Sequence, residues 1–565
     1  MENNWNTAAA QSKRQAGAGT RTSRTSRTEP AAHRGLSARA LILGALGSAL
    51  LTASSMYVAL RMGALPWPTI FASIAAMSIL KLLGGTGLNE INVAQTAMTA
   101  GAMIAGGLAF TLPGLWTEDI QPGLAEWFLP VLFVALAGLA LGLALTWYWR
   151  PMLLEREKLP FPIGMAAAET IKSGDAGGSK GLILGGSLAA SAVFTFIRDW
   201  FGKIPQMLSF GFLAPYHIEA GLMLYPMAPA IGYMIGTLYT GVLFLGGVLA
   251  YFLIIPLGVS FGFFPDAAAA ADFKNTLGLG LMVGAGIGTL LRFLYGRLKQ
   301  GRKAPSLVSF AEKKSGRAGG ARALYILAAL GAVACLKGAG LSLGVGLLVL
   351  AGGFLMTLMS CLITGETGVD PMEIFGIIVM MGVSFLTDLS WQSCLLVAAA
   401  VAVASGFAGD TMFDYRAGQI IGTDPREQLI AQAVGGLVGA VVSALTVFVI
   451  IGQFGPVFSD ALPAPQGAMV FSMVNNAFDP LIFWSGAALG AVMVLLGLPA
   501  TTLGIGMYLS FAFSAAIFLG GVIRFAVGKI WPEKVESGTV LASGVFGGES
   551  LTGVAIAFIS FFTSI

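Results

Sequence analysis

Long apolar stretches recur along most of the chain and are separated by short polar or glycine-rich segments. Residues 131–145 and 341–359 are runs of this kind, and neither alternates polar with apolar positions. A helix that crosses a bilayer needs about 20 mainly apolar residues, whereas a strand of a membrane barrel alternates over about 10. The pattern therefore predicts an all-α polytopic membrane protein with about 14–16 transmembrane helices between residues 40 and 565.

One stretch, residues 87–113, is long enough to cross a membrane yet carries many polar side chains in its first half. Because an α-helix turns by about 100° per residue, most of these side chains fall within an arc of about 120°. Lipid penalises such groups, so we expect this polar arc to face a cavity or another helix. The residues of the polar arc are Asn89, Asn92, Gln95, Thr96 and Thr99.

The opposite face of the same stretch is made of small residues and one acid. Ala94, Ala97 and Gly101 lie there, which predicts close packing against another helix. Glu90 shares this face, so we expect it to pair with a cation or to lie near the membrane interface. The polar arc leaves two interpretations open. Its side chains either line a substrate path, since they offer donors and acceptors, or hydrogen-bond to neighbouring helices.

The composition agrees with a membrane protein. Hydrophobic residues make up 56% of the chain and charged residues 11%, whereas soluble domains carry roughly a quarter charged residues. The 77 glycines suit helices that approach closely, break or kink within the membrane. The three cysteines lie in apolar stretches without a CxxC spacing, and only two histidines occur. We therefore expect no cofactor, no metal held by the protein itself and no disulfide, with carboxylates carrying any proton transfer.

Two basic segments predict the topology and the domain boundaries. Residues 1–39 form a basic tail rich in Ser, Thr and Arg, which we expect to be disordered and cytoplasmic, and residues 296–322 form a basic cytoplasmic linker. Positive charge beside a first span usually sets topology, so we expect no nucleic-acid partner. An even number of spans, about eight, should separate two cytoplasmic segments. The chain then divides into an N-terminal transmembrane half, 40–295, and a C-terminal transmembrane half, 323–565.

The two halves show faint internal similarity. Residues 159–174 and 412–428 are both weakly apolar segments marked by Pro and Gly, and residues 277–291 resemble 540–554 in their glycine pattern. An even span count per half implies a parallel, pseudo-symmetric repeat with broken or re-entrant helices. A substrate site would then lie between the halves, near the midplane of the membrane.

The segment 364–376 contains three acids on one helical face. Glu366, Asp370 and Glu373 follow one another at spacings of four and three. An acidic site for a proton or cation is one interpretation. For Asp370 and Glu373 we favour the other, a helix start with Asp370 as N-cap, Pro371 in the first turn and Glu373 as a capping-box acid. Glu366 lies outside that motif and is the better candidate for proton coupling.

Two further aspartates, Asp410 and Asp414, stand four residues apart. Asp410 is a candidate for proton coupling, whereas we expect Asp414 to form an interfacial ion pair with Arg416. Paired aspartates in a membrane also raise the alternative of an intramembrane protease. That class has a Tyr-Asp pair and a Gly-x-Gly-Asp motif in separate spans. Neither is present around Asp410 and Asp414, so an enzyme is disfavoured.

The third candidate for proton coupling, Glu549, follows two glycines, Gly544 and Gly548, whose GxxxG spacing allows close helix approach. Desolvation favours the protonated form of an unpaired carboxylate, which suits proton coupling. The alternative is a Glu at the end of a broken helix near the interface. Tyr508, in the preceding span, is a candidate for substrate binding in the same cavity, although aromatic residues in spans often only pack. The adjacent charges at 198–199 and 426–427 are expected to form pairs in loops.

Six ordered motifs resemble the oligopeptide transporter family, and the resemblance covers nearly all of the chain after residue 40. The motifs are ASSMYVALRMGALPWPTI (53–70), NEINVAQTAMTAGAMIAGGLAFTLPG (89–114), REKLPFPIGMAAAETIKSG (156–174), GQIIGTDPREQLIAQAVGG (418–436), GIGMYLSFAFSAAIFLGGVIR (504–524) and LASGVFGGESLTGV (541–554). Residues 87–90 and 423–426 depart from the signatures of the eukaryotic peptide transporters, so the chain looks closer to the yellow stripe-like and prokaryotic branch.

The resemblance implies a proton-coupled symporter that works by alternating access between two similar halves. Its substrate is expected to be a small peptide, glutathione or a peptide-like metal chelate, and a metal would enter only as part of the chelate. A passive channel and a membrane enzyme are the alternatives. We expect an integral protein of the bacterial inner membrane with a cytoplasmic N-terminus. The close-packing glycine faces are compatible with a homodimer.

Overall fold

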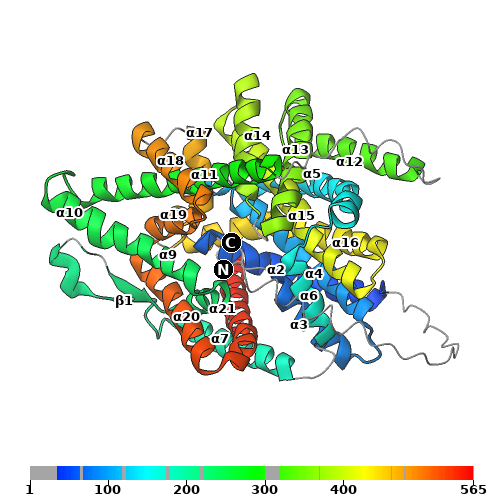
Figure 1. Ribbon diagram of the computed structural model, residues 1–565, viewed down its shortest axis with the longest axis horizontal. Helices are drawn as coiled ribbons and strands as arrows, with labels where there is room; N and C mark the ends of the chain where they lie inside the picture. Colours follow the sequence, from blue (N-terminus) through cyan, green and yellow to red (C-terminus); the bar gives the residue numbers. More distant parts are fainter. Residues whose placement is uncertain are drawn as a thin grey trace. The chain divides into compact units, whose positions relative to one another are not determined.

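Helices of very different lengths make up the first half of the chain (Figure 1). The computed structural model describes residues 35–563 except for 64–67, 117–122, 174–178, 217, 219, 300–317, 368–369, 460 and 476–478. The elements of the first half, in order, are α2 (Ala38–Met62), α3 (Pro68–Leu82), α4 (Leu88–Ala109), η1 (Pro113–Leu115), α5 (Leu124–Arg150), η2 (Pro151–Arg156), α6 (Pro162–Ser173), α7 (Ser179–Asp199), β1 (Met207–Ser209), η4 (Gly211–Tyr216), β2 (Gly221–Met223), α8 (Met227–Ile235), α9 (Thr237–Val248), η5 (Leu249–Ile254), α10 (Ile255–Ser260) and α11 (Ala267–Lys299).

The second half is also helical. Its elements are α12 (Ala318–Gly338), α13 (Leu343–Thr367), α14 (Met372–Leu386), α15 (Trp391–Ile421), α16 (Pro425–Phe454), α17 (Pro465–Asn475), α18 (Pro480–Leu495), α19 (Ala500–Tyr508), α20 (Phe511–Ile530), η7 (Pro532–Lys534) and α21 (Val535–Thr563).

Within the described residues the only sheet is the antiparallel pair β1–β2 of the first half, in which Leu208 lies opposite Leu222.

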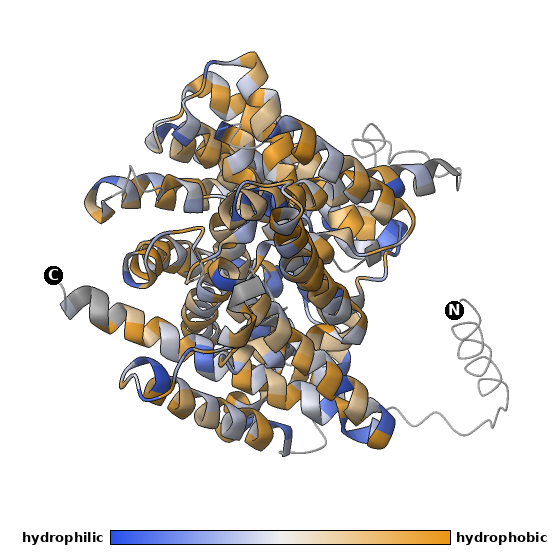
Figure 2. Ribbon diagram, turned by 90° about the vertical axis from the view of Figure 1, so that its left-hand side faces the viewer, coloured by the Kyte–Doolittle hydropathy of each residue, from blue (hydrophilic) through white to orange (hydrophobic). Residues whose placement is uncertain are grey.

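The described helices have the length and composition of a membrane protein. Nine helical segments are long and apolar enough to cross a membrane, and four more apolar helices are 10–17 residues long. Apolar residues extend along most helices in Figure 2. Large apolar side chains remain exposed, among them Leu82 at 88%, Phe263 at 78% and Phe385 at 90%. Exposure on this scale is typical of a lipid-facing surface, which confirms the predicted all-α polytopic membrane fold.

Within the described residues, some apolar stretches are interrupted. Gly236, with a φ of 94°, separates α8 from α9. Such a positive φ is readily adopted only by glycine, so the chain can change direction there. A second break, at Leu509 and Ser510, separates α19 from α20. These breaks agree with the expectation of discontinuous helices.

Helix α15 lies at the centre of the packing (Figure 1). Its most apolar window is completely buried, and the helix contacts α4, α5, α6, α13, α14 and α16. Ser390 caps its start by accepting from Ser393 N at 3.2 Å, and Gly422 ends it with a φ of 97°. The run of small residues along α15 allows this many neighbours to approach. Asp410 and Asp414, on the C-terminal half of α15, are therefore buried among other helices.

Small residues set the close helix contacts, as predicted. A side chain at Gly435 of α16 would collide with the backbone of Ala97 in α4, and one at Gly439 with Gly101. The small face of α4 therefore packs against α16, and Ala97 also contacts Gly44 of α2. On α21, Gly544 and Gly548 lie against the backbone of α7, which confirms that this GxxxG spacing mediates close approach.

Helices from both sequence halves pack against each other. The extensive contacts include α7 with α21, α11 with α18, and α4 with α15 and α16. Helix α11 continues to Lys299 and α12 begins at Ala318, so both helices reach into the predicted 296–322 linker. The rest of that linker, 300–317, and the predicted tail through residue 34 lie outside the described residues. The division into two pseudo-symmetric halves stays a prediction.

Candidate functional site

The polar arc of α4 lies against other helices. Asn92, Gln95, Thr96 and Thr99 are fully buried. Gln428 of α16 connects them, since its Nε2 donates to Asn92 Oδ1 at 3.2 Å and to Thr96 Oγ1 at 3.4 Å. The arc therefore makes the interhelical hydrogen bonds that polar residues in membrane bundles commonly provide.

The N-terminal end of α4 differs from its buried middle. Asn89 is half-buried, and its Oδ1 accepts from Thr423 Oγ1 at 3.2 Å. Glu90 pairs with Arg39 at 2.5 Å and accepts from Ser37 and Thr86, as expected of an acid paired with a cation. Substrate binding by the polar arc stays a prediction.

Asp414 joins the polar arc, and the predicted ion pair with Arg416 is wrong. Its Oδ1 accepts from Gln95 Nε2 at 2.6 Å and its Oδ2 from Thr99 Oγ1 at 3.0 Å. Arg416 donates instead to Gln419 Oε1 at 2.7 Å. Two residues along a helix correspond to a rotation of about 200°, so positions 414 and 416 point to nearly opposite sides of α15. The position of Arg416 close to Asp414 in the sequence therefore did not indicate the hydrogen-bond partners of Asp414.

Asp370 does not cap a helix, so the predicted capping motif is wrong. Helix α14 starts at Met372 with Pro371 in the N-cap position and no side-chain cap hydrogen bond. The Asp370 side chain is buried and its Oδ2 accepts from Ser360 Oγ of α13 at 2.8 Å. Glu373 lies in the first turn of α14, also buried, where the positive end of the helix favours an acid.

A second buried carboxylate, Asp410 of α15, lies near Asp370. Asp370 Oδ2 lies beside Gly409, the residue that precedes Asp410. Gly409 makes this approach possible, since a β-carbon there would collide with Asp370 Oδ2 and Ser360 Oγ. Within the described residues, Asp370 Oδ1 and Asp410 Oδ1 are both buried without a hydrogen-bond partner. We call Asp370 and Asp410 the buried acid pair. Two such carboxylates require a proton or a cation for neutralisation.

Glu366, the third acid of the 364–376 segment, lies in the last turn of α13. Its side chain is outside the described part of the structure, and its role in proton coupling stays a prediction.

Glu549 is paired with an arginine that the sequence did not connect to it. Its Oε1 lies 2.9 Å from Arg198 Nη1, its Oε2 accepts from Met227 N at 2.6 Å, and both charged side chains are fully buried. Arg198 also makes a bidentate contact with Asp199, at 2.7 Å for each hydrogen bond. The predicted pairing of Arg198 with Asp199 is confirmed, but the predicted loop location is wrong, because both residues lie at the end of α7 and Arg198 is fully buried. The proton-coupling role of Glu549 stays a prediction.

The other predicted loop pair also differs in the structure. Glu427 lies in the first turn of α16, and its Oε2 accepts from Gly35 N at 2.8 Å and from Leu36 N at 3.2 Å. Asp424 caps the same helix, with Pro425 in the first turn. Glu427 therefore binds the backbone that enters α2.

Arg61 is a buried cation whose importance the sequence reasoning missed. Its guanidinium lies 4.6 Å from the ring centre of Phe454, 4.9 Å from Tyr225 and 5.1 Å from Tyr57. The Tyr225 ring also lies 4.2 Å from the Arg198 guanidinium, so one aromatic ring contacts two cations. A lone arginine inside an apolar run was the available signal, because intramembrane charges are rare and usually functional.

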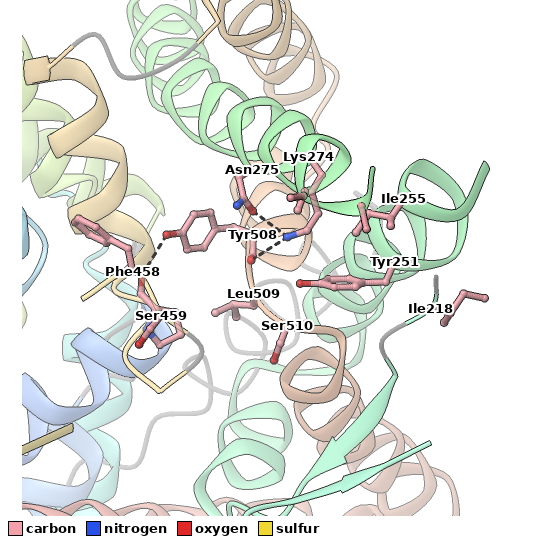
Figure 3. Close-up of a pocket in the computed structure, with 14 residues that line it drawn as sticks. Ile218, Tyr251, Ile255, Lys274, Asn275, Phe458, Ser459, Tyr508, Leu509 and Ser510 are labelled. Carbon is pink, nitrogen blue, oxygen red and sulfur yellow. Dashed lines mark hydrogen bonds between the residues drawn. The ribbon is translucent and has the colours of Figure 1, made fainter. Parts of the chain in front are cut away.

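A cavity of about 510 Å³ lies beside the break between α19 and α20 (Figure 3). Lys274 of α11 lies on its wall, and the break contributes Tyr508, Leu509 and Ser510. Lys274 Nζ donates to Asn275 Oδ1 at 2.8 Å, to Met507 O at 3.1 Å and to Tyr508 O at 3.5 Å. The lysine thus occupies the C-terminal end of α19, where backbone carbonyls lack helical partners.

A second cavity, of about 640 Å³, adjoins the first. Asn275, Phe458 and Tyr508 lie on the walls of both. Asp272 of α11 and Asp479, the N-cap of α18, line only the second cavity. Tyr508, the predicted substrate residue, therefore separates two hollows, and its hydroxyl donates to Pro463 O at 3.4 Å. Its role in binding stays a prediction. The sequence signal for Lys274 was a lysine inside a mostly apolar helix.

The described residues contain no group of three or more His, Cys, Asp or Glu side chains placed to hold a metal ion. The cysteines Cys335, Cys361 and Cys394 are free thiols. The expectation that the protein itself holds no cofactor stays a prediction.

Comparison with known proteins decides the class of this chain. Residues 36–560 match the family model described as OPT oligopeptide transporter protein. The chain belongs to the oligopeptide transporter family. A relative from Haemophilus influenzae, named "Putative oligopeptide transporter", is 24% identical over 610 aligned positions, which cover 89% of this chain and 92% of that protein. The family resemblance inferred from the six motifs is confirmed, and the cavities and buried charges above belong to a membrane transport protein.

Proposed function

We propose that this protein carries small peptides across the membrane, coupled to protons and by alternating access, and that peptide-like metal chelates fall within the same substrate class. Membership of the oligopeptide transporter family and the name of the Haemophilus influenzae relative support the peptide part of the proposal. The bacterial inner membrane and a cytoplasmic N-terminus are part of the same proposal, from the basic segments at residues 1–39 and 296–322.

The observation that carries proton coupling is the buried acid pair. Asp370 and Asp410 are 8% and 2% exposed, and each has a buried oxygen without a hydrogen-bond partner in the described structure. Two neighbouring carboxylates in such surroundings do not both stay ionised, so one proton bound between them neutralises the repulsion. Loss of that proton makes this arrangement unfavourable. A proton can therefore stabilise one conformation of the transporter relative to another.

The position of the pair suits such a role. Asp410 lies on α15, the central helix, and Asp370 lies in the segment between α13 and α14. A change of charge there acts directly on the contacts of three helices. In the proposed cycle, proton and substrate favour the same conformation, so each increases the affinity for the other by the same factor.

The test is peptide uptake by the purified protein in liposomes. With an imposed inward proton gradient, the wild-type protein should accumulate a labelled tripeptide above its external concentration. Asp410→Asn and Asp370→Asn remove the titrating group but keep the shape of the side chain. Each should equilibrate the peptide without accumulating it. Asp266→Asn, at the exposed start of α11, is the matched control and should accumulate peptide normally.

Two results would reject the proposal. Wild-type uptake that ignores the gradient indicates a passive channel, and uptake by both buried variants that still follows the gradient removes the acid pair from coupling. The substrate class is tested separately by thermal unfolding, since a bound substrate raises apparent stability by mass action. Tripeptides, glutathione and peptide-like metal chelates would be compared at equal concentration.

A further inference from the structure

The two adjoining cavities carry opposite charge. Among the described residues that line the first, Lys274 is the only Lys, Arg, His, Asp or Glu. Among those that line the second, Asp272 and Asp479 carry charge, and both are acids. The cavities share Asn275, Phe458 and Tyr508, so a molecule that occupies both passes the polar groups of Asn275 and Tyr508.

Lys274 makes the first cavity suited to an anion. The side chain is only 3% exposed, so its charge is poorly screened by water. Its ammonium group is held between the carbonyls that end α19 and the Tyr251 ring, 4.7 Å away, and points toward the cavity in Figure 3. Ser510, the N-cap of the 20-residue helix α20, lies on the same wall and makes no side-chain cap hydrogen bond. The amides at the start of α20 add to the positive potential.

The second cavity is suited to a cation. Asp272 is an exposed side chain on α11, two residues from Lys274, and Asp479 caps α18 by accepting from Leu481 N at 2.9 Å. The polar groups between the two charged ends, on Asn275 and Tyr508, can donate to and accept from peptide groups. Cavities of 510 and 640 Å³ lie within the size range of small-molecule sites.

We propose that the two cavities form one binding site for a zwitterionic peptide. Lys274 binds the terminal carboxylate, Asp272 and Asp479 bind the terminal ammonium, and Asn275 and Tyr508 contact the backbone between them. This inference rests on the proposed peptide transport. It adds the chemical feature that selects the substrate, namely two opposite charges at the ends of one chain.

The experiment uses four forms of trialanine: free, C-terminally amidated, N-terminally acetylated, and blocked at both ends. Each competes with labelled free trialanine for uptake into liposomes that contain the full-length protein. Thermal unfolding with each peptide reports binding independently of transport. For the wild-type protein, blocking either end should weaken competition about tenfold, which corresponds to about 1.4 kcal/mol.

The variants separate the two ends. Lys274→Gln should lose the preference for free over amidated peptide and keep the preference for free over acetylated peptide. The double variant Asp272→Asn, Asp479→Asn should show the reverse, and Asn retains the capping ability of position 479. Lys337→Gln, an exposed lysine at the end of α12, and Asp266→Asn, a capping acid outside both cavities, are the matched controls. Both should keep both preferences.

Three results would overturn the inference. If the wild-type protein transports all four peptides equally well, the zwitterion site is rejected while peptide transport stands. If it neither binds nor transports any of them, peptide transport and the site are rejected together. If Lys274→Gln weakens free and amidated peptides equally, Lys274 only supports the end of α19. Should Lys274→Gln fail to fold, the wild-type preferences and the double aspartate variant still decide the outcome.

Discussion

The buried acid pair and the pair formed by Glu549 and Arg198 are both buried but have opposite electrostatic environments. Glu549 has a guanidinium 2.9 Å away and a backbone amide at 2.6 Å. Asp370 and Asp410 lie near each other, and among the described contacts only a serine hydroxyl donates to them. A carboxylate beside a buried arginine is stabilised as an anion, whereas two neighbouring carboxylates favour proton uptake. From this comparison we expect proton exchange at the buried acid pair rather than at Glu549.

The largest effect is expected from removing the arginine. Arg198→Met leaves Glu549 as a buried charge without its paired arginine, which should destabilise the protein by about 3–5 kcal/mol. Thermal unfolding of the purified protein in detergent measures this. The double variant Arg198→Met, Glu549→Met should recover part of the loss, and Arg426→Met, on the exposed start of α16, should change little. An unchanged unfolding temperature for Arg198→Met would remove the contrast between the two sites.

A smaller effect is expected from separating the helices that hold Glu549 in place. A β-carbon at Gly548 would collide with the backbone oxygen of Leu188, so Gly548→Ala should force α21 away from α7. Overpacking of this kind costs about 1–3 kcal/mol. Gly382→Ala is the control, since a β-carbon there meets no atom within 4 Å. Equal unfolding temperatures for the two variants would contradict the proposed contact.

Asp414 provides an intermediate case, an acid held by neutral donors. Gln428 Nε2 donates to Asp414 O at 2.6 Å and also reaches Asn92 and Thr96. Gln428→Met should destabilise the protein by about 1 kcal/mol, because a hydrogen bond between membrane helices contributes on average only about 0.6 kcal/mol to stability. Thermal unfolding beside Gln419→Met, on the exposed side of α15, measures the difference. Because Gln428 donates to the backbone oxygen of Asp414 and not to its carboxylate, a loss as large as that of Arg198→Met would contradict the modest contribution expected of these interhelical hydrogen bonds.

The smallest effect on stability is expected at the buried acid pair. In Asp410→Asn the new asparagine resembles the protonated acid in shape and charge. The free energy of unfolding should therefore change by less than about 0.5 kcal/mol, with a correspondingly small shift in the unfolding temperature. Glu549→Gln should lower it clearly, because Arg198 loses one of its two acids. Loss of proton-driven accumulation by Asp410→Asn with normal unfolding would support the comparison. Equal destabilisation by Asp410→Asn and Glu549→Gln would show that Asp410 and Glu549 contribute equally to stability, against the comparison.

Much of the fold could be predicted because it depends on local composition. Apolar length indicated membrane helices, and the spacing of Gly544 and Gly548 indicated a close helix contact. The small face of residues 87–113 indicated another. Each of these predictions uses a periodicity that persists in the folded chain. The four-residue steps of α21 and α4 therefore carried over directly into their packing.

The site was harder to predict because its contacts join distant positions. Asp414 was expected to pair with Arg416 but accepts from Gln95, 319 positions away. Glu549 was expected to be unpaired but lies beside Arg198, 351 positions earlier in the chain. Lys274 was not singled out, although a lysine in an apolar helix was a signal. Side chains at these distances meet only through helix packing.

By itself the sequence determined the membrane class, the helical periodicity and the family, because each depends on the composition and spacing of neighbouring residues or on the order of short motifs. The tertiary structure alone decided which buried charges are neutralised. Burial makes every intramembrane charge unfavourable until a partner approaches, and the partner's position depends on which helices pack together. Helix packing therefore places an arginine beside Glu549, and an amide and a hydroxyl beside the carboxylate of Asp414. It places Asp370 and Asp410 near each other.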